Sequence, residues 1–306
     1  MTPVIDGPHA LSALSAQLAD AVEAVSPAVV QVDGRSRRPS SGIVWAPELV
    51  LAAEHALERE HDLTVETASG PPLPAQLLGR DSASDLAVMR VPGLGIEPAP
   101  PAAAPARVGQ FVLAVGRPGG RALMASLGIV SAVGGPVRTR GGLLDQYIRT
   151  DATPYPGFSG GPLIDARGAV LGLLTTGLAG GIALAVPAGL AWRLGETLAR
   201  QGHVPRGWLG IGSQPVQLPV SQRAGRGHEV GLLIVDVARE SPAERGGVLV
   251  GDILVTVDGQ AIRDPEDLQA RLSGDWIGRT VLIELLRGGT LVTLRIAIGQ
   301  RPGLPR

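Results

Sequence analysis

YPGFSGGPLID, residues 155–165, places a serine in a glycine-rich turn directly before an apolar strand. A serine that acts as the nucleophile in acyl transfer has to be exposed on a tight turn, with backbone N–H groups that converge on the developing oxyanion. Gly157 has no Cβ, so its peptide adopts such a turn at little steric cost. We therefore predict Ser159 as a nucleophile and the N–H groups of Gly157 and Ser159 as the oxyanion donors.

The serine needs a base, and two upstream segments supply a candidate base and its acidic partner. LVLAAEHAL (49–57) places His55 just after a buried strand, and SDLAVMRV (84–91) places Asp85 at the start of another apolar strand. The order His, Asp, Ser fits a catalytic triad. In such a triad Ser159 attacks the carbonyl, His55 relays the proton, and Asp85 holds the histidine tautomer and stabilises the imidazolium.

Each of the three residues also has an ordinary structural explanation. A serine in a glycine-rich turn is usually a turn residue, a lone histidine is more often a surface or core residue, and an aspartate before a strand is commonly a turn former. The chain has five histidines, so any one of them carries little information. The combination of the three, with apolar strands beside them in this order, is what favours the triad.

A metal site is the other chemistry that the region around the histidine suggests. His55, Glu58 and His61 in EHALEREH (54–61) are potential ligands. Their spacing does not match HExxH, and no third ligand cluster is evident in the sequence. We therefore predict no metal site and no cofactor.

Short apolar segments, separated by glycine, proline or charged turns, continue on both sides of the serine turn. Many short strands at regular spacing are typical of a β-barrel or β-sandwich. Apolar residues at helical spacing predict a helix over 9–25, and a second helix is expected over about 187–201, ending near Gly202. The predicted strands of this part of the chain cover residues 29–33, 42–45, 49–53, 86–91, 111–116, 127–133, 169–176 and 181–187.

One uncharged stretch, Gly168–Trp192, is long enough to span a bilayer. A Thr-Thr pair, a Gly-Gly pair and a proline interrupt it, so we interpret it as two buried strands joined by a turn. The N-terminus does not resemble a signal peptide, because no basic residue precedes Arg35 and acidic residues interrupt the early segment. The sequence therefore predicts no membrane span, and a cytoplasmic location unless a leader has been removed.

Composition limits the class of protein. The 306 residues are 44% hydrophobic and 18% charged, which is typical of an ordered chain long enough for two domains. Cysteine is absent, which excludes disulfides, thiol catalysis and thiolate metal sites. All 27 basic residues are arginine, which excludes a Walker A lysine, a Schiff base and a Ser–Lys dyad. A formal net charge of −1 argues against nucleic acid as a partner.

Four segments together resemble the HtrA/Deg family of trypsin-like serine proteases. They are SSGIVW (40–45), EHAL (54–57), SDLAVMRV (84–91) and TDATPYPGFSGGPLID (150–165). The resemblance implies a mostly β fold, with two six-stranded trypsin-like β-barrels over residues 1–204 and a PDZ domain, a β-sandwich with two helices, over residues 205–306. It also implies a serine endopeptidase that hydrolyses unfolded or misfolded proteins in protein quality control.

The candidate site departs from the family at one position. The family usually has Asn before the nucleophile, and this chain has Phe158. Because the oxyanion donors are backbone groups, the change need not abolish them, but it can alter the turn or the subsites on the leaving-group side. A catalytically latent chaperone or PDZ peptide-binding protein is therefore the alternative to an active protease.

The resemblance also indicates where a substrate binds. GIALAVP (181–187) is similar to the strand that lines the family's specificity pocket, and its aliphatic residues Ile182 and Leu184 are the expected pocket walls. Residues 153–158 contain no acid, the feature that selects basic P1 residues in trypsin-like enzymes. We therefore expect small or medium apolar P1 residues such as Val or Ala, in a substrate strand that adds beside residues 181–184.

The C-terminal segment RESPAERGGVLVGDILVTVDGQAI (239–262) resembles the family's PDZ signature, with Val248 where Leu is usual. A peptide groove is expected between the strand that starts near Ile211 and a helix over 265–273, which Asp264 can cap. Leu268 and Leu272 either line this groove or belong to the core. The loop expected to receive a peptide carboxylate on its backbone N–H groups is WLGI, that is Trp208, Leu209, Gly210 and Ile211.

Partners and compartment are implied by the resemblance as well. Substrates are unfolded polypeptides, and peptide C-termini bind the PDZ domain. Family members are commonly trimers built through N-terminal contacts, which implies a homotrimer, although the aromatic residues that often make those contacts are absent before Trp45. The family resemblance indicates a periplasmic or extracellular location, in contrast to the cytoplasmic one that the sequence itself indicates.

Overall fold

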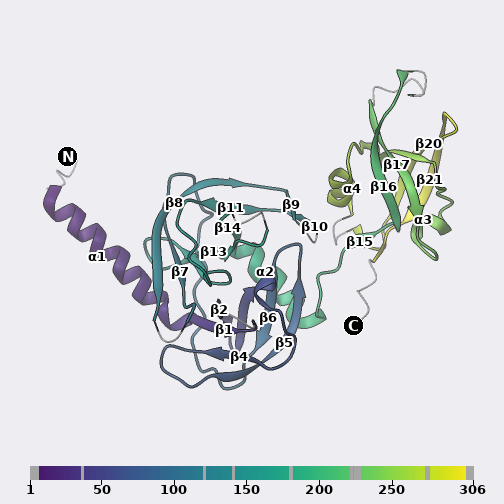
Figure 1. Cartoon of the computed structure of the whole chain (residues 1–306). Coiled ribbons are helices and arrows are strands. Elements are labelled where there is room, and N and C mark those ends of the chain that lie inside the picture. The colour runs from purple at the N-terminus through teal and green to yellow at the C-terminus, as the bar shows by residue number, and fades with distance from the viewer. Residues whose placement is uncertain are drawn as a thin grey trace. The chain divides into compact units, whose positions relative to one another are not determined.

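The chain divides into two compact units, Met1–Val204 and Pro205–Arg306, and strands dominate both of them (Figure 1). The computed structural model describes residues 7–35, 38–119, 122–139, 142–178, 182–220, 223, 229–272 and 276–300.

The first barrel closes in the strand order β1-β2-β3-β6-β5-β4. β3 and β6 pair antiparallel with Ala53 opposite Leu86. Because His55 follows β3 and Asp85 precedes β6, this register brings the two residues to the same edge of the barrel. The strands are β1 (Val29–Asp33), β2 (Ser40–Ala46), β3 (Leu49–Ala53), β4 (Leu63–Glu66), β5 (Leu73–Asp81) and β6 (Leu86–Arg90).

The second barrel closes in the order β11-β14-β13-β12-β7-β8, which confirms the expected double-barrel fold. The Gly160 N–H donates to the Leu174 carbonyl, and the Leu174 N–H donates to the Gly161 carbonyl, both at 2.8 Å. These bonds fix the serine turn beside the end of β13. The strands are β7 (Phe111–Gly116), β8 (Met124–Gly134), β11 (Tyr147–Thr150), β12 (Pro162–Ile164), β13 (Val170–Thr175) and β14 (Leu184–Pro187), with a separate ribbon of β9 (Val137–Thr139) and β10 (Gly142–Leu144).

Aliphatic side chains fill both barrels, as the 3% aromatic content requires. The helix α2 (Ala188–Gln201) packs on β5, β6, β13 and β14, and every residue of β13 is buried. The predicted end of this helix is confirmed, because Gly202 follows it with φ +78°. Residues 168–192 thus contribute β13, β14 and the start of α2, as the strand interpretation predicted. Among the helices of the described residues, none is long and apolar enough to cross a membrane.

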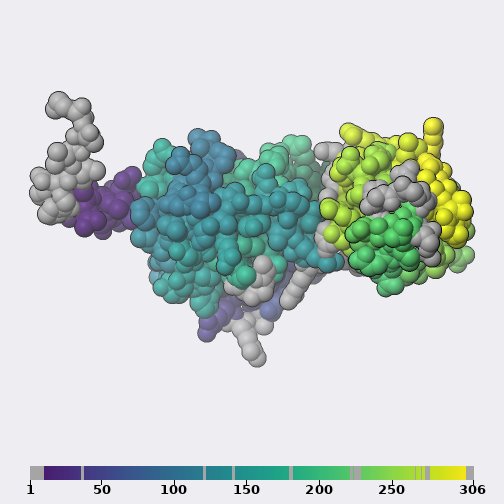
Figure 2. Space-filling model, turned by 90° about the horizontal axis from the view of Figure 1, so that it is seen from above, coloured from purple at the N-terminus to yellow at the C-terminus, as the bar shows by residue number. Residues whose placement is uncertain are grey.

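The N-terminal helix α1 (Gly7–Val25) is joined to β1 by a 3-10 turn, η1 (Ser26–Ala28). Its last turns pack on the barrels through Ala21 and Val25, which are buried in the aliphatic core. The start of the helix extends away from the barrels, as the purple segment of Figure 2 shows. Leu11 is 73% exposed there, so part of the apolar face of α1 is uncovered in the single chain.

The second unit is a sheet in the order β16-β17-β18-β20-β21, with β19 paired to β18 and β15 paired to β22. The predicted cap of α4 is confirmed, because Asp264 Oδ1 accepts the Asp267 N–H at 2.7 Å. The elements are β15 (Gly207–Trp208), β16 (Ile211–Gln217), β17 (Val230–Val237), α3 (Pro242–Arg245), β18 (Ile253–Val257), β19 (Gln260–Ala261), α4 (Pro265–Arg271), β20 (Thr280–Arg287), β21 (Thr290–Ala297) and β22 (Gly299–Gln300).

An ion pair between the buried Asp252 and the partly exposed Arg287 joins two parts of this sheet. Arg287, at the end of β20, donates Nε and Nη2 to the two carboxylate oxygens of Asp252, each at 2.8 Å. Burial favours the neutral acid, but the hydrogen bonds from Arg287 and from the Leu249 N–H, with the Arg287 charge, keep the pKa of Asp252 below its ordinary value. The two-point geometry ties the loop before β18 to β20.

Candidate active site

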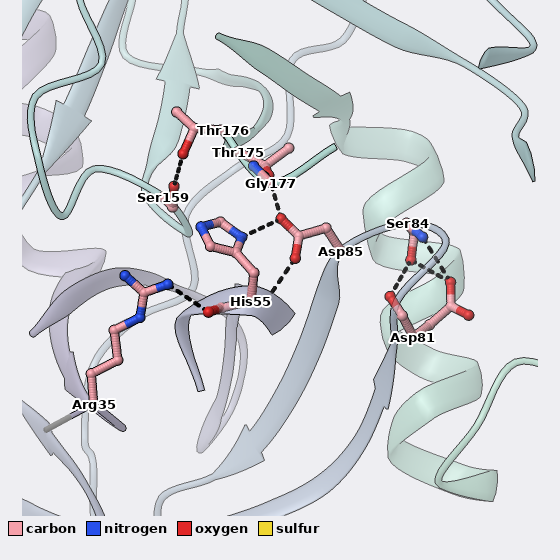
Figure 3. Close-up of polar contacts among 9 residues, drawn as sticks. All are labelled: Arg35, His55, Asp81, Ser84, Asp85, Ser159, Thr175, Thr176 and Gly177. Atoms are coloured by element: carbon pink, nitrogen blue, oxygen red, sulfur yellow. Dashed lines mark hydrogen bonds and ion pairs between the residues drawn. The ribbon is translucent and has the colours of Figure 1, made fainter. Parts of the chain in front are cut away.

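His55 and Asp85 are held together at the edge of the first barrel (Figure 3). His55 lies in a 3-10 turn, η2 (Glu54–Ala56), directly after β3, and Asp85 takes φ +55° directly before β6. Aspartate tolerates this left-handed conformation better than most residues. Asp85 Oδ2 lies 2.6 Å from His55 Nδ1, and Oδ1 accepts the His55 backbone N–H at 2.8 Å. The carboxylate therefore orients both the ring and the main chain of the histidine.

This contact determines which nitrogen of the ring is left as a base. An ionised carboxylate only accepts hydrogen bonds, so Nδ1 carries the proton that faces Asp85. Nε2 of the neutral ring is then the acceptor, and it is the atom that can take a proton from a nucleophile. Asp85 is 3% exposed, which keeps water from competing for its oxygens.

Thr175, at the end of β13, also donates its hydroxyl to Asp85 Oδ2. The Gly177 N–H donates to Thr175 Oγ1 at 3.0 Å and so orients the threonine. A Cβ at Gly177 would lie 2.5 Å from His55 Nδ1, so the chain passes too close to this pair for any side chain. Sequence reasoning missed Thr175, because a threonine at the end of a strand carries no signal of such a role.

The serine lies in a turn that we call the nucleophile turn, residues 155–160. The Phe158 N–H donates to the Tyr155 carbonyl at 3.0 Å, and Gly157 has φ +89°, as in a type II turn with Pro156 at its second position. A Cβ at Gly157 would lie 2.4 Å from Pro118 Cβ, so both the conformation and the space require glycine. Within the described residues, the N–H groups of Gly157 and Ser159 donate to no other residue, which leaves both available to a ligand.

The hydroxyl of Ser159 lies 3.2 Å from Thr176 Oγ1. Figure 3 shows the His55 ring between Asp85 on one side and Ser159 on the other. Across the described part of the chain, the serine hydroxyl bonds to Thr176 and not to His55. Hydrogen bonds of a catalytic site are often long or misaligned without substrate and tighten when it binds.

Phe158 points into the second barrel, where it is fully buried in the aliphatic core. Its ring packs edge-on against Tyr155, with ring centroids 5.4 Å apart. A Cβ at Gly116 would lie 2.7 Å from the Phe158 ring, so β7 closes over it from the other side. Because the side chain is fully buried, it shapes the turn from below and does not form a subsite for substrate.

The two residues expected to wall the specificity pocket differ in exposure. Ile182 is 45% exposed, whereas Leu184 is buried in β14 and packs in the core. β14 pairs with β13 and β11, so Leu184 contributes to the barrel wall. Of this pair, Ile182 is the side chain that can touch a bound polypeptide directly.

In the second unit, Leu209 and Gly210 link β15 to β16. Their carbonyls accept the N–H groups of Ala243 at 2.9 Å and Ala238 at 2.8 Å. Their own N–H groups donate to no other residue in the part of the chain that the structure describes. Gly210 has φ +82°, and a Cβ there would lie 2.2 Å from Ser241 Cβ, so glycine is required for the approach to α3.

The remaining residues of the expected peptide groove lie around these two. Trp208 ends β15, Ile211 begins β16, and α4 contacts β16. Leu268 and Leu272 are buried in the aliphatic core of the second unit, which is the core alternative of the two that the sequence left open.

Among the described residues, no three His, Cys, Asp or Glu side chains lie together in a group that could hold a metal ion. His61 is exposed, and the ring of His55 is engaged by Asp85.

Closed double barrels with this histidine, aspartate and serine arrangement define the class of trypsin-like peptidases, and the comparisons agree. A trypsin-like peptidase domain model matches residues 40–173, and a PDZ domain model matches residues 207–298. Probable periplasmic serine endoproteases described as DegP-like are similar over 88% of this chain. The one from Rhizobium meliloti (strain 1021) is 34% identical over 54% of its own length, and the one from Ectopseudomonas mendocina (strain ymp) is 32% identical over 58%. The chain thus spans about half the length of these curated relatives.

Solved structures match along nearly their whole length. The HtrA-type protease AlgW with a tripeptide is 31% identical, with a TM-score of 0.74 and coverage of 94% of this chain and 98% of that one. A serine endoprotease from Yersinia pestis is 27% identical, with a TM-score of 0.74 and coverage of 93% and 98%. The chain belongs to the HtrA family of trypsin-like serine proteases with a PDZ domain.

Proposed function

We propose that this protein is a serine endopeptidase that hydrolyses unfolded or misfolded polypeptides, with His55, Asp85 and Ser159 as its triad. The observation that carries the proposal is the buried Asp85 carboxylate, which holds the His55 ring at 2.6 Å. It leaves Nε2 free, on the side of the ring where Ser159 lies in a glycine-rich turn. A surface histidine with an ordinary structural role does not need a buried carboxylate that binds both its ring and its backbone.

The chemistry follows from these groups. Ser159 Oγ attacks the scissile carbonyl while its proton passes to His55 Nε2, and the carbonyl oxygen becomes an oxyanion between the N–H groups of Gly157 and Ser159. His55 then returns the proton to the leaving amine, and an acyl-enzyme on Ser159 remains. Water repeats the sequence with His55 as the base and releases the acid. Asp85 stays ionised throughout and stabilises the imidazolium.

The arrangement favours extended substrates with an apolar P1 residue. A polypeptide that adds as a strand beside residues 181–184 has to be unfolded there, because its backbone N–H and C=O groups must be free. Ile182 offers an aliphatic contact, and residues 153–158 contain no acid to select a basic side chain.

Digestion of denatured casein by the full chain is the experiment that tests both the activity and this preference. We expect cleavage that a serine-directed fluorophosphonate inhibits, with the adduct on Ser159 and with Val or Ala dominant at P1 in the mass-spectrometric map of the fragments. A dominant Arg or Lys at P1 would overturn the assignment of the pocket. An absence of both cleavage and adduct would overturn the assignment of the function.

The bond between Ser159 and Thr176 keeps one other function in consideration. In a catalytically latent chaperone or PDZ peptide-binding protein, the serine hydroxyl would stay on Thr176 when polypeptide binds. Such a protein would suppress the aggregation of denatured casein without cutting it, which the same digestion distinguishes.

The second unit is proposed to bind peptide C-termini. Leu209 and Gly210 present backbone N–H groups that other described residues do not use, and a carboxylate is the ligand that such a pair of N–H groups favours. Binding there would deliver substrates to the protease or activate it. The groove beside these residues is proposed to involve Trp208, Ile211 and α4.

We also infer that the chain forms a homotrimer through its N-terminal helix. An apolar groove lies between α1 and the second barrel, and Leu11 and Leu127, which line it, are exposed. Apolar surface of this kind usually marks an interface. The groove is lined by Leu11, Leu14, Leu18, Val22, Leu113 and Leu127, among others.

A truncated chain, residues 1–204, tests both proposals in one preparation. We expect it to sediment as a trimer, since the groove belongs to the first unit, and to digest casein more slowly than the full chain. We also expect it to lose the response to added peptides with free C-termini. An unchanged rate and an unchanged response would count against the peptide-binding role, and a monomer for both chains would count against the trimer.

The compartment is proposed from the names of the relatives, which place those proteins in the periplasm. Fractionation of cells that produce this protein, followed by immunoblotting, would locate it, and recovery with the cytosolic fraction would refute a periplasmic site.

A further inference from the structure

Ser41, in β2 of the first barrel, is bonded to the nucleophile turn of the second barrel at two points. Its hydroxyl donates to the Gly157 carbonyl at 2.7 Å, and its backbone N–H donates to the Ser159 carbonyl at 3.2 Å. The residue is fully buried. One residue thus contacts the turn on both sides of Phe158, through its hydroxyl on one side and through its backbone N–H on the other.

The bond to the Gly157 carbonyl restrains the part of the turn that carries an oxyanion donor. The peptide that joins Gly157 to Phe158 is held at both ends, because its N–H donates to Tyr155 and its carbonyl accepts from Ser41. The neighbouring peptide, between Pro156 and Gly157, carries the Gly157 N–H. It is the central peptide of the turn, whose rotation interconverts type I and type II turns and reverses the direction of that N–H.

The Ser41 hydroxyl is itself fixed by Arg117, which follows β7. The Arg117 backbone N–H donates to Ser41 Oγ at 2.8 Å. Since this bond uses a lone pair of the hydroxyl oxygen, the hydroxyl hydrogen is free to face Gly157. A rotation of the Ser41 side chain would break both bonds and leave buried polar groups without partners.

The side chain of Arg117 extends the chain of bonds to the segment after α1. Its Nε donates to the Val29 carbonyl at 2.8 Å, and Nη2 lies 3.2 Å from the Ser26 carbonyl. The residue is 1% exposed. Burial lowers the pKa of Arg117, partly offset by the charge of Glu66, yet an arginine remains protonated at any physiological pH. A buried cation is stable only where it is hydrogen-bonded, so this geometry is strongly specified.

We propose that Ser41 and Arg117 are positioning residues that hold the nucleophile turn in the conformation that presents the Gly157 N–H to the oxyanion. The proposal rests on the proteolytic function proposed above. It connects the end of α1 to the oxyanion donors through Ser26, Arg117, Ser41 and Gly157, in that order. Both residues are buried, so we expect them to act on the transition state through the turn rather than on substrate binding.

The chain offers a matched control in the adjacent residue. Ser40 lies in the same strand and is 2% exposed, but its buried hydroxyl has no hydrogen-bond partner in the described residues. Ser41→Ala and Ser40→Ala therefore remove the same atom from neighbouring buried positions, and only the first removes bonds to the turn.

The test compares the two variants in the full chain, with a peptide substrate and a peptide boronate that mimics the tetrahedral intermediate. We expect Ser41→Ala to lower kcat by about 10–100-fold, somewhat less than the loss of an oxyanion donor. KM should stay unchanged, and the boronate should bind more weakly by a similar factor. Ser40→Ala should leave kcat, KM and boronate affinity unchanged. Equal kcat values for the two variants would overturn the proposal.

A second measurement does not depend on activity. Amide hydrogen exchange of the peptide that covers residues 155–161 should be faster in Ser41→Ala than in wild type or Ser40→Ala. If the wild-type chain cleaves nothing, the proposed function fails, and this exchange measurement still decides whether Ser41 holds the turn. Unchanged exchange in Ser41→Ala would overturn the proposal in either case.

Arg117 is tested by its coupling to Ser41. If both act through one chain of bonds, the double variant Ser41→Ala with Arg117→Met should lose little more than Ser41→Ala does, because residues of one network are not additive. Arg117→Lys keeps the charge and one donor, so its kcat should lie between that of Arg117→Met and that of wild type. If the kcat losses of Ser41→Ala and Arg117→Met are fully additive, Arg117 does not act on the turn through Ser41. If the arginine variants do not fold, the Ser41 and Ser40 pair still decides the proposal.

Discussion

Replacing Ser159 with alanine is expected to lower the cleavage of denatured casein by on the order of 10⁶-fold, which places it below detection in an ordinary digestion. The hydroxyl oxygen is the atom that forms the acyl-enzyme. The neighbouring hydroxyl of Thr176 is not placed to substitute for it, because it lies on the far side of the Ser159 hydroxyl from the imidazole (Figure 3). Residual hydrolysis would come from the oxyanion donors and from substrate binding.

This experiment needs a control for folding and one for contamination. The alanine variant removes one hydroxyl from a small turn, so its thermal unfolding should match that of wild type. Ser82→Ala, at an exposed serine in the turn before Asp85, should digest casein at the wild-type rate. Wild-type cleavage by the Ser159 variant would mean that another nucleophile or a contaminating protease does the cutting.

The second large effect is expected for Asp85→Asn, which should lower kcat by about 10⁴-fold. An amide is nearly the same size as the carboxylate, so the pocket around it should not collapse. Its NH₂ group, however, can donate to His55 Nδ1, and this stabilises the tautomer in which Nε2 carries the proton and cannot act as a base. The imidazolium that forms in the transition state also loses its counter-charge.

Asp81→Asn is the matched control for this change. Asp81 is a buried carboxylate four residues earlier, and it accepts from the N–H and the hydroxyl of Ser84 rather than from His55. Asp81→Asn should lower the midpoint of thermal unfolding and leave kcat close to that of wild type. Asp85→Asn should lower kcat and leave the midpoint close to that of wild type. Equal kcat values for the two variants would remove Asp85 from the proposed triad.

Several strands of the barrels could not be predicted from the sequence. β5 contains Pro74 and Gly79, residues that usually interrupt a strand, yet it forms because the barrel closes around it. Tertiary packing requires glycine at position 79, since a Cβ there would lie 2.6 Å from the carbonyl oxygen of Gly202 at the end of α2. β4 and β12 have four and three residues, too few for a periodic pattern to be recognised.

Local patterns were enough for the elements whose structure depends on their own residues. The glycines of the nucleophile turn, the cap at Asp264 and the end of α2 at Gly202 are set by backbone conformation over a few residues, so the sequence determined them. The segments around His55, Asp85 and Ser159 and the PDZ signature indicated the family for the same reason, because each of them is a contiguous stretch of sequence.

The partners of the candidate site were decided only by the tertiary structure. Thr175 donates to Asp85 across 90 positions of the chain, and Ser41 reaches Gly157 across 116. A threonine at a strand end and a serine at a strand start are ordinary residues in sequence, and their role appears when the barrels close and bring them to buried acceptors. Sequence by itself determined which residues carry the proposed chemistry, and the closure of the barrels determined which others hold them in place, because a hydrogen bond depends on distance in space and not on separation along the chain.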